Sequence, residues 1–281
     1  MSTAPALFSL ERETIVVTGG YGLIGRALVS GLHGLGARIG VIEPRVSEAQ
    51  SEAAFGALAK NDRIGVFAAD VTKRDQLEAA LTEIKAQLGG PTGLVNNAAL
   101  DSPPDAPISE NGPFESYPEE SWDRVMNVNV KGVFLCCQVF GAAMAQSGRG
   151  AIVNVSSIYG AVSPDQALYE FRREDGQEFY KPVAYSASKS ALYNLTRYVA
   201  VYWGPKNVRA NTVTFAGVFN NQDPRFLEAY ARKIPLRRDK PQLRNMAEPN
   251  DYIGAIGFLL SPASSYMTGA DIRVDGGFMA V

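Results

Sequence analysis

The amino-acid sequence predicts an α/β protein with a doubly wound parallel sheet of seven strands between two layers of helices. Two observations lead to this fold class. Seven short runs rich in β-branched residues alternate with longer stretches of helical periodicity, which is typical of βαβ units with parallel strands. No internal repeat, low-complexity tract or linker divides the chain of 281 residues, so we expect a single domain over residues 1–281.

The expected strands and helices alternate along most of the chain. Each strand is a short apolar run that suits a sheet buried on both faces. The strands are expected at Thr14–Thr18, Arg38–Ile42, Ile64–Ala68, Gly93–Asn96, Ala151–Val155, Val208–Val213 and Ile272–Val274. The helices are expected at Leu23–Leu35, Ser47–Lys60, Lys73–Leu88, Glu119–Gln146, Val183–Trp203 and Pro249–Leu260. Right-handed crossovers between such strands place helices on both faces of the sheet, giving three α/β/α layers.

The composition argues against several classes of protein. Hydrophobic residues make up 46% of the chain and charged residues 20%, which is too apolar for a disordered protein. The net charge of -2 gives no overall attraction to nucleic acid or to an anionic membrane. The two cysteines, Cys136 and Cys137, are adjacent, so they cannot form a disulfide framework. With neither a secretory leader nor a run of about 18 apolar residues, we expect a cytoplasmic protein.

A glycine-rich turn follows the first expected strand and leads directly into the first expected helix. Its sequence, residues 18–25, is TGGYGLIG. Glycines permit a tight turn and let backbone N–H groups approach a pyrophosphate closely. A plain strand-to-helix turn would also contain glycines, but the position in a βαβ unit favours a dinucleotide cofactor. The expected contacts are Gly19, Tyr21, Gly22, Leu23 and Ile24.

Polar residues at the ends of the next strands extend this predicted cofactor site. Glu43 ends the second strand, where a dinucleotide fold places the acid that binds the adenosine ribose diol. Its carboxylate would repel the 2′-phosphate of NADP and so favours NAD, whereas the guanidinium of Arg45 is compatible with NADP. Ligands of open α/β sheets bind at the carboxyl ends of strands. We therefore expect further cofactor contacts at Asp70, Val71, Asn97, Ala98 and Ala99.

A possible acid–base pair lies at the start of the expected helix Val183–Trp203. Tyr185 and Lys189 are four residues apart and so share one helix face. A lysine ammonium beside a phenol favours the phenolate and lowers the pKa of the tyrosine toward neutral pH. Ser156 or Ser157, which follow the fifth expected strand, could hold a substrate oxygen. The tyrosine–lysine spacing alone favours an ordinary amphipathic helix.

Taken together, these motifs resemble the short-chain dehydrogenase/reductase family over nearly the whole chain. Eight segments occur in the family's order: TGGYGLIG, AADVT, NNAA, VNVKG, IVNVSS, YSASK, VRANTV and SYMTGADIRVDGG. The resemblance implies a Rossmann-like seven-stranded sheet, a nicotinamide cofactor, and hydride transfer at an alcohol or carbonyl carbon. It also implies roles for four residues. Tyr185 would be the acid/base, Lys189 would bind the nicotinamide ribose and tune Tyr185, Ser157 would orient the substrate oxygen, and Asn129 would support a proton-relay water.

Two departures from the family pattern concern the cofactor site. The spacing of Gly19, Gly22 and Gly25 resembles the glycine spacing of nucleotide-sugar epimerases and dehydratases, which use tightly bound NAD. The motif at residues 275–277 (DGG) instead resembles the C-terminal motif of the compact dehydrogenases. After the sixth strand, residues 214–221 (TFAGVFNN) lack the family's Pro-Gly and threonine. Cofactor contacts are expected there at Gly217 and Val218. A non-catalytic dinucleotide-binding regulator is a third possibility, disfavoured by the complete set of four catalytic residues.

The remaining departures bear on the substrate. Ser157 and Tyr185 are 28 positions apart, which is about twice the separation usual in the family. We therefore expect an inserted loop over residues 161–182 beside the pocket. The substrate-covering segment, residues 219–246, is rich in arginine and lysine. A polar, sugar-derived substrate, either neutral or anionic, would suit both segments. The alternatives are a loop used in subunit packing and a solvated basic helix face. The candidate substrate contacts are Asp165, Tyr169, Arg172, Asn220 and Arg225.

Two expectations concern metals and subunits. No cluster of His, Cys, Asp and Glu has metal-ligand spacing, so no metal site is expected. The helices expected at Glu119–Gln146 and Val183–Trp203 are more apolar than one sheet face requires. This favours a homodimer or homotetramer, and the family resemblance implies the tetramer.

Overall fold

The computed structural model describes residues 4–101, 107, 111–243 and 245–280 of the chain. Its seven parallel strands lie in the order β3-β2-β1-β4-β5-β6-β7, which confirms the predicted fold class. Strand order reverses between β1 and β4, and this reversal is the point where doubly wound folds bind ligands. The strands are β1 (Thr14–Thr18), β2 (Arg38–Glu43), β3 (Ile64–Ala68), β4 (Gly93–Asn96), β5 (Gly150–Ser157), β6 (Val208–Phe215) and β7 (Asp271–Val274).

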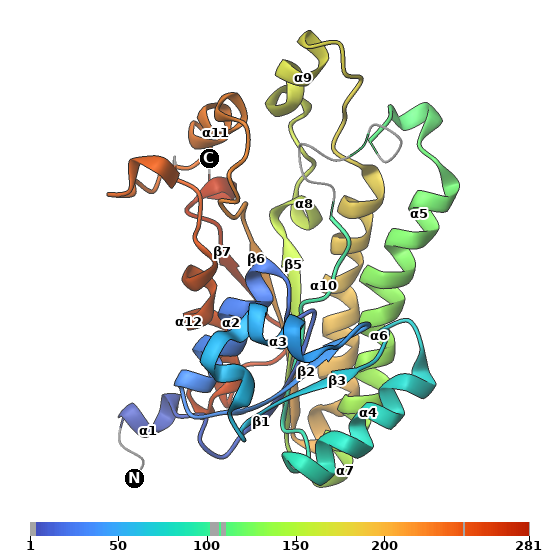
Figure 1. The fold of residues 1–281 in the computed structure, drawn as a ribbon, viewed down its shortest axis with the longest axis vertical. Coiled ribbons are helices and arrows are strands. Elements are labelled where there is room, and N and C mark those ends of the chain that lie inside the picture. The colour runs from blue at the N-terminus through green and yellow to red at the C-terminus, as the bar shows by residue number, and fades with distance from the viewer. Residues whose placement is uncertain (1–3, 102–106, 108–110, 244, 281) are drawn as a thin grey trace.

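Helices cover both faces of the sheet (Figure 1). One layer contains α2 (Leu23–Gly34), α3 (Glu48–Phe55) and α12 (Ile253–Leu260). The other contains α4 (Arg74–Gln87), α10 (Val183–Trp203), and a long helix formed by α5 (Glu119–Met126), α6 (Val133–Cys136) and α7 (Ala142–Ser147). Two π-helical segments, Asn127–Gly132 and Cys137–Gly141, connect the three parts of the long helix.

The apolar residues of the central strands are divided between the two faces of the sheet. All five residues of β1 are buried; Val16 packs on the side of α4 and α10, whereas Ile15 and Val17 pack on the side of α2 and α12. Successive side chains of a strand point to opposite faces, so one continuous apolar run serves two cores. This is why the strand runs of the sequence show no polar alternation.

The long helix Glu119–Ser147 is long enough and apolar enough to cross a membrane, with a mean hydropathy of 1.5 over its most apolar window. The structure buries 56% of that window inside the protein. Val133, Cys136 and Phe140 pack in the same core cluster as residues of α4 and α10. The apolar face of this helix therefore has a partner within the fold, as expected of a core helix of a globular domain.

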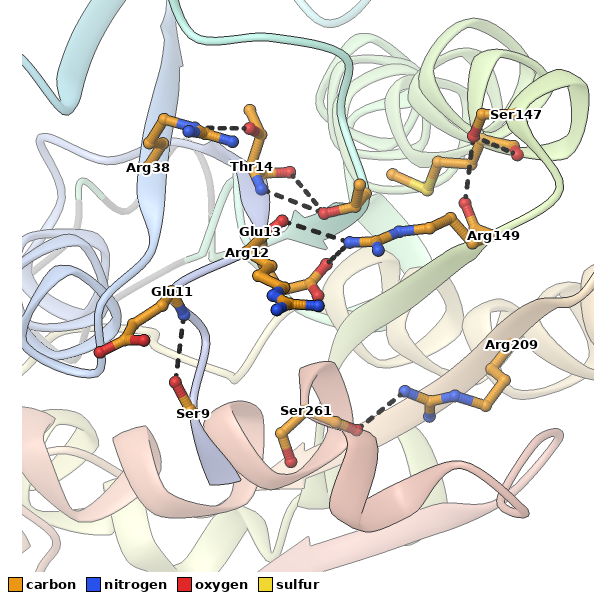
Figure 2. Close-up of polar contacts among 12 residues, drawn as sticks. Ser9, Glu11, Arg12, Glu13, Thr14, Arg38, Ser147, Arg149, Arg209 and Ser261 are labelled. Carbon is orange, nitrogen blue, oxygen red and sulfur yellow. Dashed lines mark hydrogen bonds and ion pairs between the residues drawn. The ribbon is translucent and has the colours of Figure 1, made fainter. Parts of the chain in front are cut away.

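Polar contacts hold together the amino end of the sheet (Figure 2). The Arg149 guanidinium binds the Glu13 carboxylate at 2.8 Å and the carbonyl oxygen of Arg12 at 3.2 Å, joining the loops before β5 and β1. Arg38 donates to the Thr14 hydroxyl, and Arg209 donates to the carbonyl of Ser261. These contacts lie at the end of the sheet opposite to the carboxyl ends of the strands.

A cap lies over the carboxyl ends of the strands. It contains α8 (Ile158–Ala161), α9 (Glu170–Glu174) and α11 (Pro224–Ala231), which Figure 1 shows at one end of the molecule, whereas α1 (Ala4–Phe8) lies at the other. The inserted segment 161–182 is folded, and its aromatic residues pack against α11. Ring centroids lie 5.1 Å apart for Tyr169 and Phe179 and 5.5 Å apart for Tyr169 and Phe226. The insertion and the substrate-covering segment therefore form one apolar cluster.

Candidate active site

A cavity of about 700 Å³ lies at the carboxyl ends of the strands, between the glycine-rich turn and the cap. Most of the residues that the sequence singled out line it. From the predicted cofactor set these are Gly19, Gly22, Leu23, Ile24, Glu43, Asp70, Val71, Asn97, Ala98, Ala99, Gly217 and Val218. Ser157, Tyr185 and Lys189 of the predicted catalytic set also line it, as do Tyr169 and Asn220 of the predicted substrate set.

The glycine-rich turn packs so closely that no side chain fits at two of its positions. Gly19 has a positive φ of 69°, and a Cβ added to Gly25 would overlap the carbonyl oxygen of Gly19. Gly22 lies at the N-cap of α2 and has no side chain to bond the first N–H groups of the helix. Those N–H groups remain available to an anionic ligand, and the helix dipole favours negative charge there.

Hydrogen bonds fix this turn against β4. The side-chain amide of Asn97 donates to the carbonyl oxygens of Thr18 and Gly19, both at 3.0 Å. In return, the Thr18 hydroxyl accepts from the backbone N–H groups of Asn97 and Ala98. Asn97 and Thr18 therefore hold the adjacent ends of β1 and β4 together at the point where the strand order reverses.

Glu43 lines the cavity at the expected strand end. Its carboxylate accepts a hydrogen bond of 2.6 Å from the backbone N–H of Tyr21, while burial raises its pKa and this bond opposes the rise. Tyr21 itself does not line the cavity, because its hydroxyl bonds to Ser51 and its ring packs against Phe55. Tyr21 thus contributes its backbone to the turn, and its expected contact with the cofactor stays a prediction.

Asn129 lies beside the cavity rather than in its lining. It is fully buried in the π-helical segment Asn127–Gly132, where its side chain bonds to both backbone groups of Leu100, at 2.7 and 3.0 Å. Its amide also donates to the Ser188 hydroxyl, which in turn donates to the carbonyl of Tyr185. Asn129 therefore joins the loop after β4 to the helix that holds Tyr185. π-helical turns inside α-helices are frequent at functional sites.

Ser157, Tyr185 and Lys189 meet at the centre of the cavity lining. The Ser157 hydroxyl lies close enough to Tyr185 to lower the pKa of its phenol, and it accepts a hydrogen bond from the N–H of Tyr159. The neighbouring Ser156 instead donates to the carbonyl of Lys189, so its hydroxyl holds α10 in place. Lys189 donates to the carbonyl of Val155 at 2.8 Å. A serine, a phenol and an ammonium group around one space can hold a substrate oxygen and transfer its proton.

Comparison with known proteins agrees with this geometry. Residues 22–279 match the family described as Enoyl-(Acyl carrier protein) reductase. The chain is 35% identical over 275 residues to a galactitol 2-dehydrogenase of Rhizobium johnstonii, covering 96% of each chain. It is 33% identical to 2-(S)-hydroxypropyl-CoM dehydrogenase 3 of Xanthobacter autotrophicus, covering 97% of this chain and 98% of that one. The chain belongs to the short-chain dehydrogenase/reductase family.

A solved structure shows the same fold. A short-chain dehydrogenase from Leptospira borgpetersenii with bound NAD⁺ matches with a TM-score of 0.80 and 28% identity, covering 99% of this chain and 96% of that one. This short-chain dehydrogenase/reductase is therefore an NAD(P)-dependent oxidoreductase that transfers a hydride between nicotinamide and a secondary alcohol or ketone. The predicted dehydrogenase function is supported over the epimerase, dehydratase and regulator alternatives.

The electrostatics of Tyr185 differ from the sequence-based expectation. Burial and the Asp101 carboxylate raise its pKa, and the hydrogen bond with Ser157 opposes them. Lys189 does not bond to the phenol; its ammonium lies 5.9 Å from the ring centroid, and burial lowers the pKa of Lys189 to about 8. The predicted lowering of the Tyr185 pKa by Lys189 is therefore not found in this dehydrogenase. The ammonium is directed to the Val155 carbonyl instead.

A second lysine near Tyr185 was missed by the sequence analysis. Lys181 ends the inserted segment, is buried, and places its ammonium 4.7 Å from the centroid of the Tyr185 ring. The ammonium also forms an ion pair of 2.5 Å with Asp101, and both side chains line the cavity. Gln166 bonds to both backbone groups of Lys181 and fixes its position. Spacing along the sequence could not have predicted this contact, because Lys181 precedes the first residue of α10, Val183, and is positioned by Gln166 and Asp101.

Three predicted substrate contacts do not line the cavity. Asp165 pairs with Lys233 at 2.7 Å, and Arg172 donates to Gln177 at 2.7 Å. Arg225 binds Asp175 at 2.7 Å and Asp223 at 3.2 Å. These contacts are confined to the cap, so the structure places the three residues outside the cavity lining, and their assignment to the substrate stays a prediction.

The other basic residues of the substrate-covering segment show why its positive charge does not reach the cavity. Arg232 pairs with Glu228, and Arg238 pairs with Glu248 and Asp251. Lys240 also pairs with Glu248, and Arg244 lies outside the described residues. The positive charge of the segment is thus offset by Glu228 within it and by Glu248 and Asp251 just after it.

We predict that Asp101→Asn shifts the pH dependence of alcohol oxidation to lower pH. The Asp101 carboxylate disfavours the phenolate, so its removal lowers the pKa of Tyr185 and the base forms at a lower pH. The pH profile of kcat/KM for oxidation measures this shift. Asp175→Asn, which alters an exposed pair of the cap, is the matched control and should leave the profile unchanged. An unchanged or upward-shifted profile in Asp101→Asn would contradict the assignment.

Proposed function

We propose that this enzyme interconverts a secondary alcohol and a ketone in an uncharged polyol or related sugar-derived substrate. The observation that carries the proposal is the chemistry of the cavity wall beyond Ser157 and Tyr185. That wall contains the phenol groups of Tyr159, Tyr169 and Tyr230 together with the amide of Asn220. Phenols offer hydroxyl groups for hydrogen bonding and flat apolar faces for packing, which suits a hydroxylated carbon chain. The similarity to a galactitol 2-dehydrogenase supports the same substrate class.

The arrangement of charges in the cap argues against an anionic substrate. The arginines expected to bind it form ion pairs within the cap. Among the described residues of the inserted segment, Lys181 is the cation that lines the cavity. Its ammonium is paired with the Asp101 carboxylate. A substrate held mainly by neutral hydrogen-bonding groups fits this arrangement better than a phosphorylated one.

The residues around the cavity suggest a division of roles. A nicotinamide dinucleotide, when bound, accepts or supplies the hydride. Tyr185 exchanges a proton with the substrate oxygen, and Ser157 holds that oxygen by a hydrogen bond. Asn129 acts through Leu100 and Ser188 and so positions the loop and helix on either side of the reacting groups.

The first experiment is a substrate panel with purified enzyme and NAD⁺. We expect reduced cofactor to form with galactitol and shorter polyols faster than with sugar phosphates or apolar alcohols. Tyr185→Phe should reduce kcat by about 10²-fold or more while cofactor affinity stays within about twofold, because only the exchangeable phenol proton is lost. Normal turnover in this variant would exclude Tyr185 as the acid/base. Turnover confined to phosphorylated or apolar substrates would overturn the proposed substrate class.

We further propose that NAD is preferred over NADP, because the Glu43 carboxylate lines the part of the cavity where the adenosine ribose of a dinucleotide fold lies. Titration of protein fluorescence with NADH and NADPH should show tighter binding of NADH. In Glu43→Gln the difference should shrink by about tenfold, since the charge that repels the 2′-phosphate is removed. Arg45→Gln removes the guanidinium that is compatible with NADP, so it should leave NADH affinity unchanged and should not shrink the difference. Equal affinity of the wild-type enzyme for both cofactors would contradict the proposal.

The enzyme is also proposed to form a homo-oligomer through α10. Tyr198, Val201 and Tyr202 are exposed there, and the rings of Tyr198 and Tyr202 stack with centroids 6.0 Å apart. An apolar surface of this kind on a helix favours contact with a second copy. Light scattering should give two or four times the chain mass of 30.2 kDa, and Val201→Glu should lower it. A wild-type mass of one chain would contradict this proposal.

A further inference from the structure

The hydroxyl group of Tyr159 is buried in the cavity wall without a hydrogen-bond partner among the described residues. Only 8% of the residue is exposed, and burial raises the pKa of its phenol to about 12. The Tyr169 hydroxyl is close enough to lower that pKa, but it does not reach hydrogen-bonding geometry. A buried hydroxyl without a hydrogen-bond partner lowers the stability of the protein. In a cavity wall, such a group indicates a ligand that supplies the missing hydrogen bond.

Other tyrosines of the same region have partners. Tyr252 donates to the carbonyl of Ala216 at 2.9 Å, and Tyr193 shares a hydrogen bond of 2.8 Å with Thr214. Tyr230 accepts a hydrogen bond of 2.7 Å from the N–H of Gly217. This last bond uses an oxygen lone pair of Tyr230, and its own hydroxyl proton remains available to donate.

The position of Tyr159 relates it to the reacting groups. It follows Ser157 by two residues, and its backbone N–H donates to the Ser157 hydroxyl at 3.2 Å. Tyr159, Tyr185 and Tyr230 line the same cavity together with Ser157. A substrate oxygen held by Ser157 and Tyr185 therefore brings its neighbouring carbon toward Tyr159 and Tyr230.

We propose that Tyr159 and Tyr230 bind the hydroxyl group on the carbon next to the reacting carbon, so that the enzyme selects vicinal diols. The Tyr230 hydroxyl donates to the oxygen of that group, and the Tyr159 hydroxyl accepts its proton. This inference rests on the proposed function and names the feature of the polyol that is recognised. A site built to bond a hydroxyl rejects an analogue that lacks it, because its own polar groups are then left unpaired.

The test compares two alcohols that differ by this one hydroxyl, butane-2,3-diol and butan-2-ol, with NAD⁺ as cofactor. The wild-type enzyme should have the higher kcat/KM for the diol. Tyr159→Phe removes the hydroxyl and keeps the ring, so it should lower the diol-to-monoalcohol ratio of kcat/KM by about tenfold or more. Its kcat/KM for butan-2-ol should stay within about threefold of the wild-type value.

Thermal stability gives an independent readout. Tyr159→Phe should leave Tm unchanged or raise it, because it removes an unpaired buried hydroxyl. Tyr252→Phe is the matched control; it breaks the bond to Ala216, so it should lower Tm and keep the diol preference. With NAD⁺ present, butane-2,3-diol should raise the Tm of the wild-type enzyme more than that of Tyr159→Phe.

The outcomes separate the inference from the proposed function. If wild type and Tyr159→Phe have the same diol-to-monoalcohol ratio, the diol site is overturned, whereas turnover of both alcohols leaves the hydride chemistry intact. A water molecule bonded to Tyr159 would give this result. If the wild-type enzyme binds NADH but oxidises neither alcohol nor any polyol of the panel, the proposed function fails and the inference falls with it.

Discussion

The parallel direction of the seven strands is the constraint on which the site depends. It brings every strand's carboxyl end to one edge of the sheet, and the change of strand order between β1 and β4 opens that edge to a ligand. The opening is kept in shape by Asn97 and Thr18, which bond the two strand ends to each other. The glycine-rich turn, the β5 serine and the first turn of α10 all face the same cavity as a result.

The inserted segment determines much of what lies beyond this common site. Its aromatic residues pack into the cluster that includes α11, so the segment is part of the cavity wall. This packing carries Lys181 to the face of the Tyr185 ring and sets Tyr169 beside Tyr159. The inserted segment therefore supplies part of the cavity wall beyond the common site, next to Tyr159 of α8 and Tyr230 of α11.

Charge is arranged differently in the two halves of the cavity. Toward the glycine-rich turn, free N–H groups of a helix N-terminus and the Glu43 carboxylate suit a dinucleotide. Toward the cap, the wall is mainly phenolic, and the arginines outside it are bound to carboxylates. Exposed arginines with carboxylates in reach form such pairs readily, and each pair cancels most of the field that would attract an anion.

The sequence by itself determined the fold class, the strand runs, the glycine-rich turn and the residues Ser157, Tyr185 and Lys189. The fold elements and the turn depend on periodicity and spacing, which local sequence contains, whereas the three residues were identified by the resemblance of several ordered motifs to one family. Only the tertiary structure decided that Arg225, Arg172 and Asp165 pair within the cap, that Lys189 donates to the Val155 carbonyl, and that Tyr159 lacks a partner. The physical reason is that pairing and burial depend on atoms brought together from distant segments, and no count within one segment contains them.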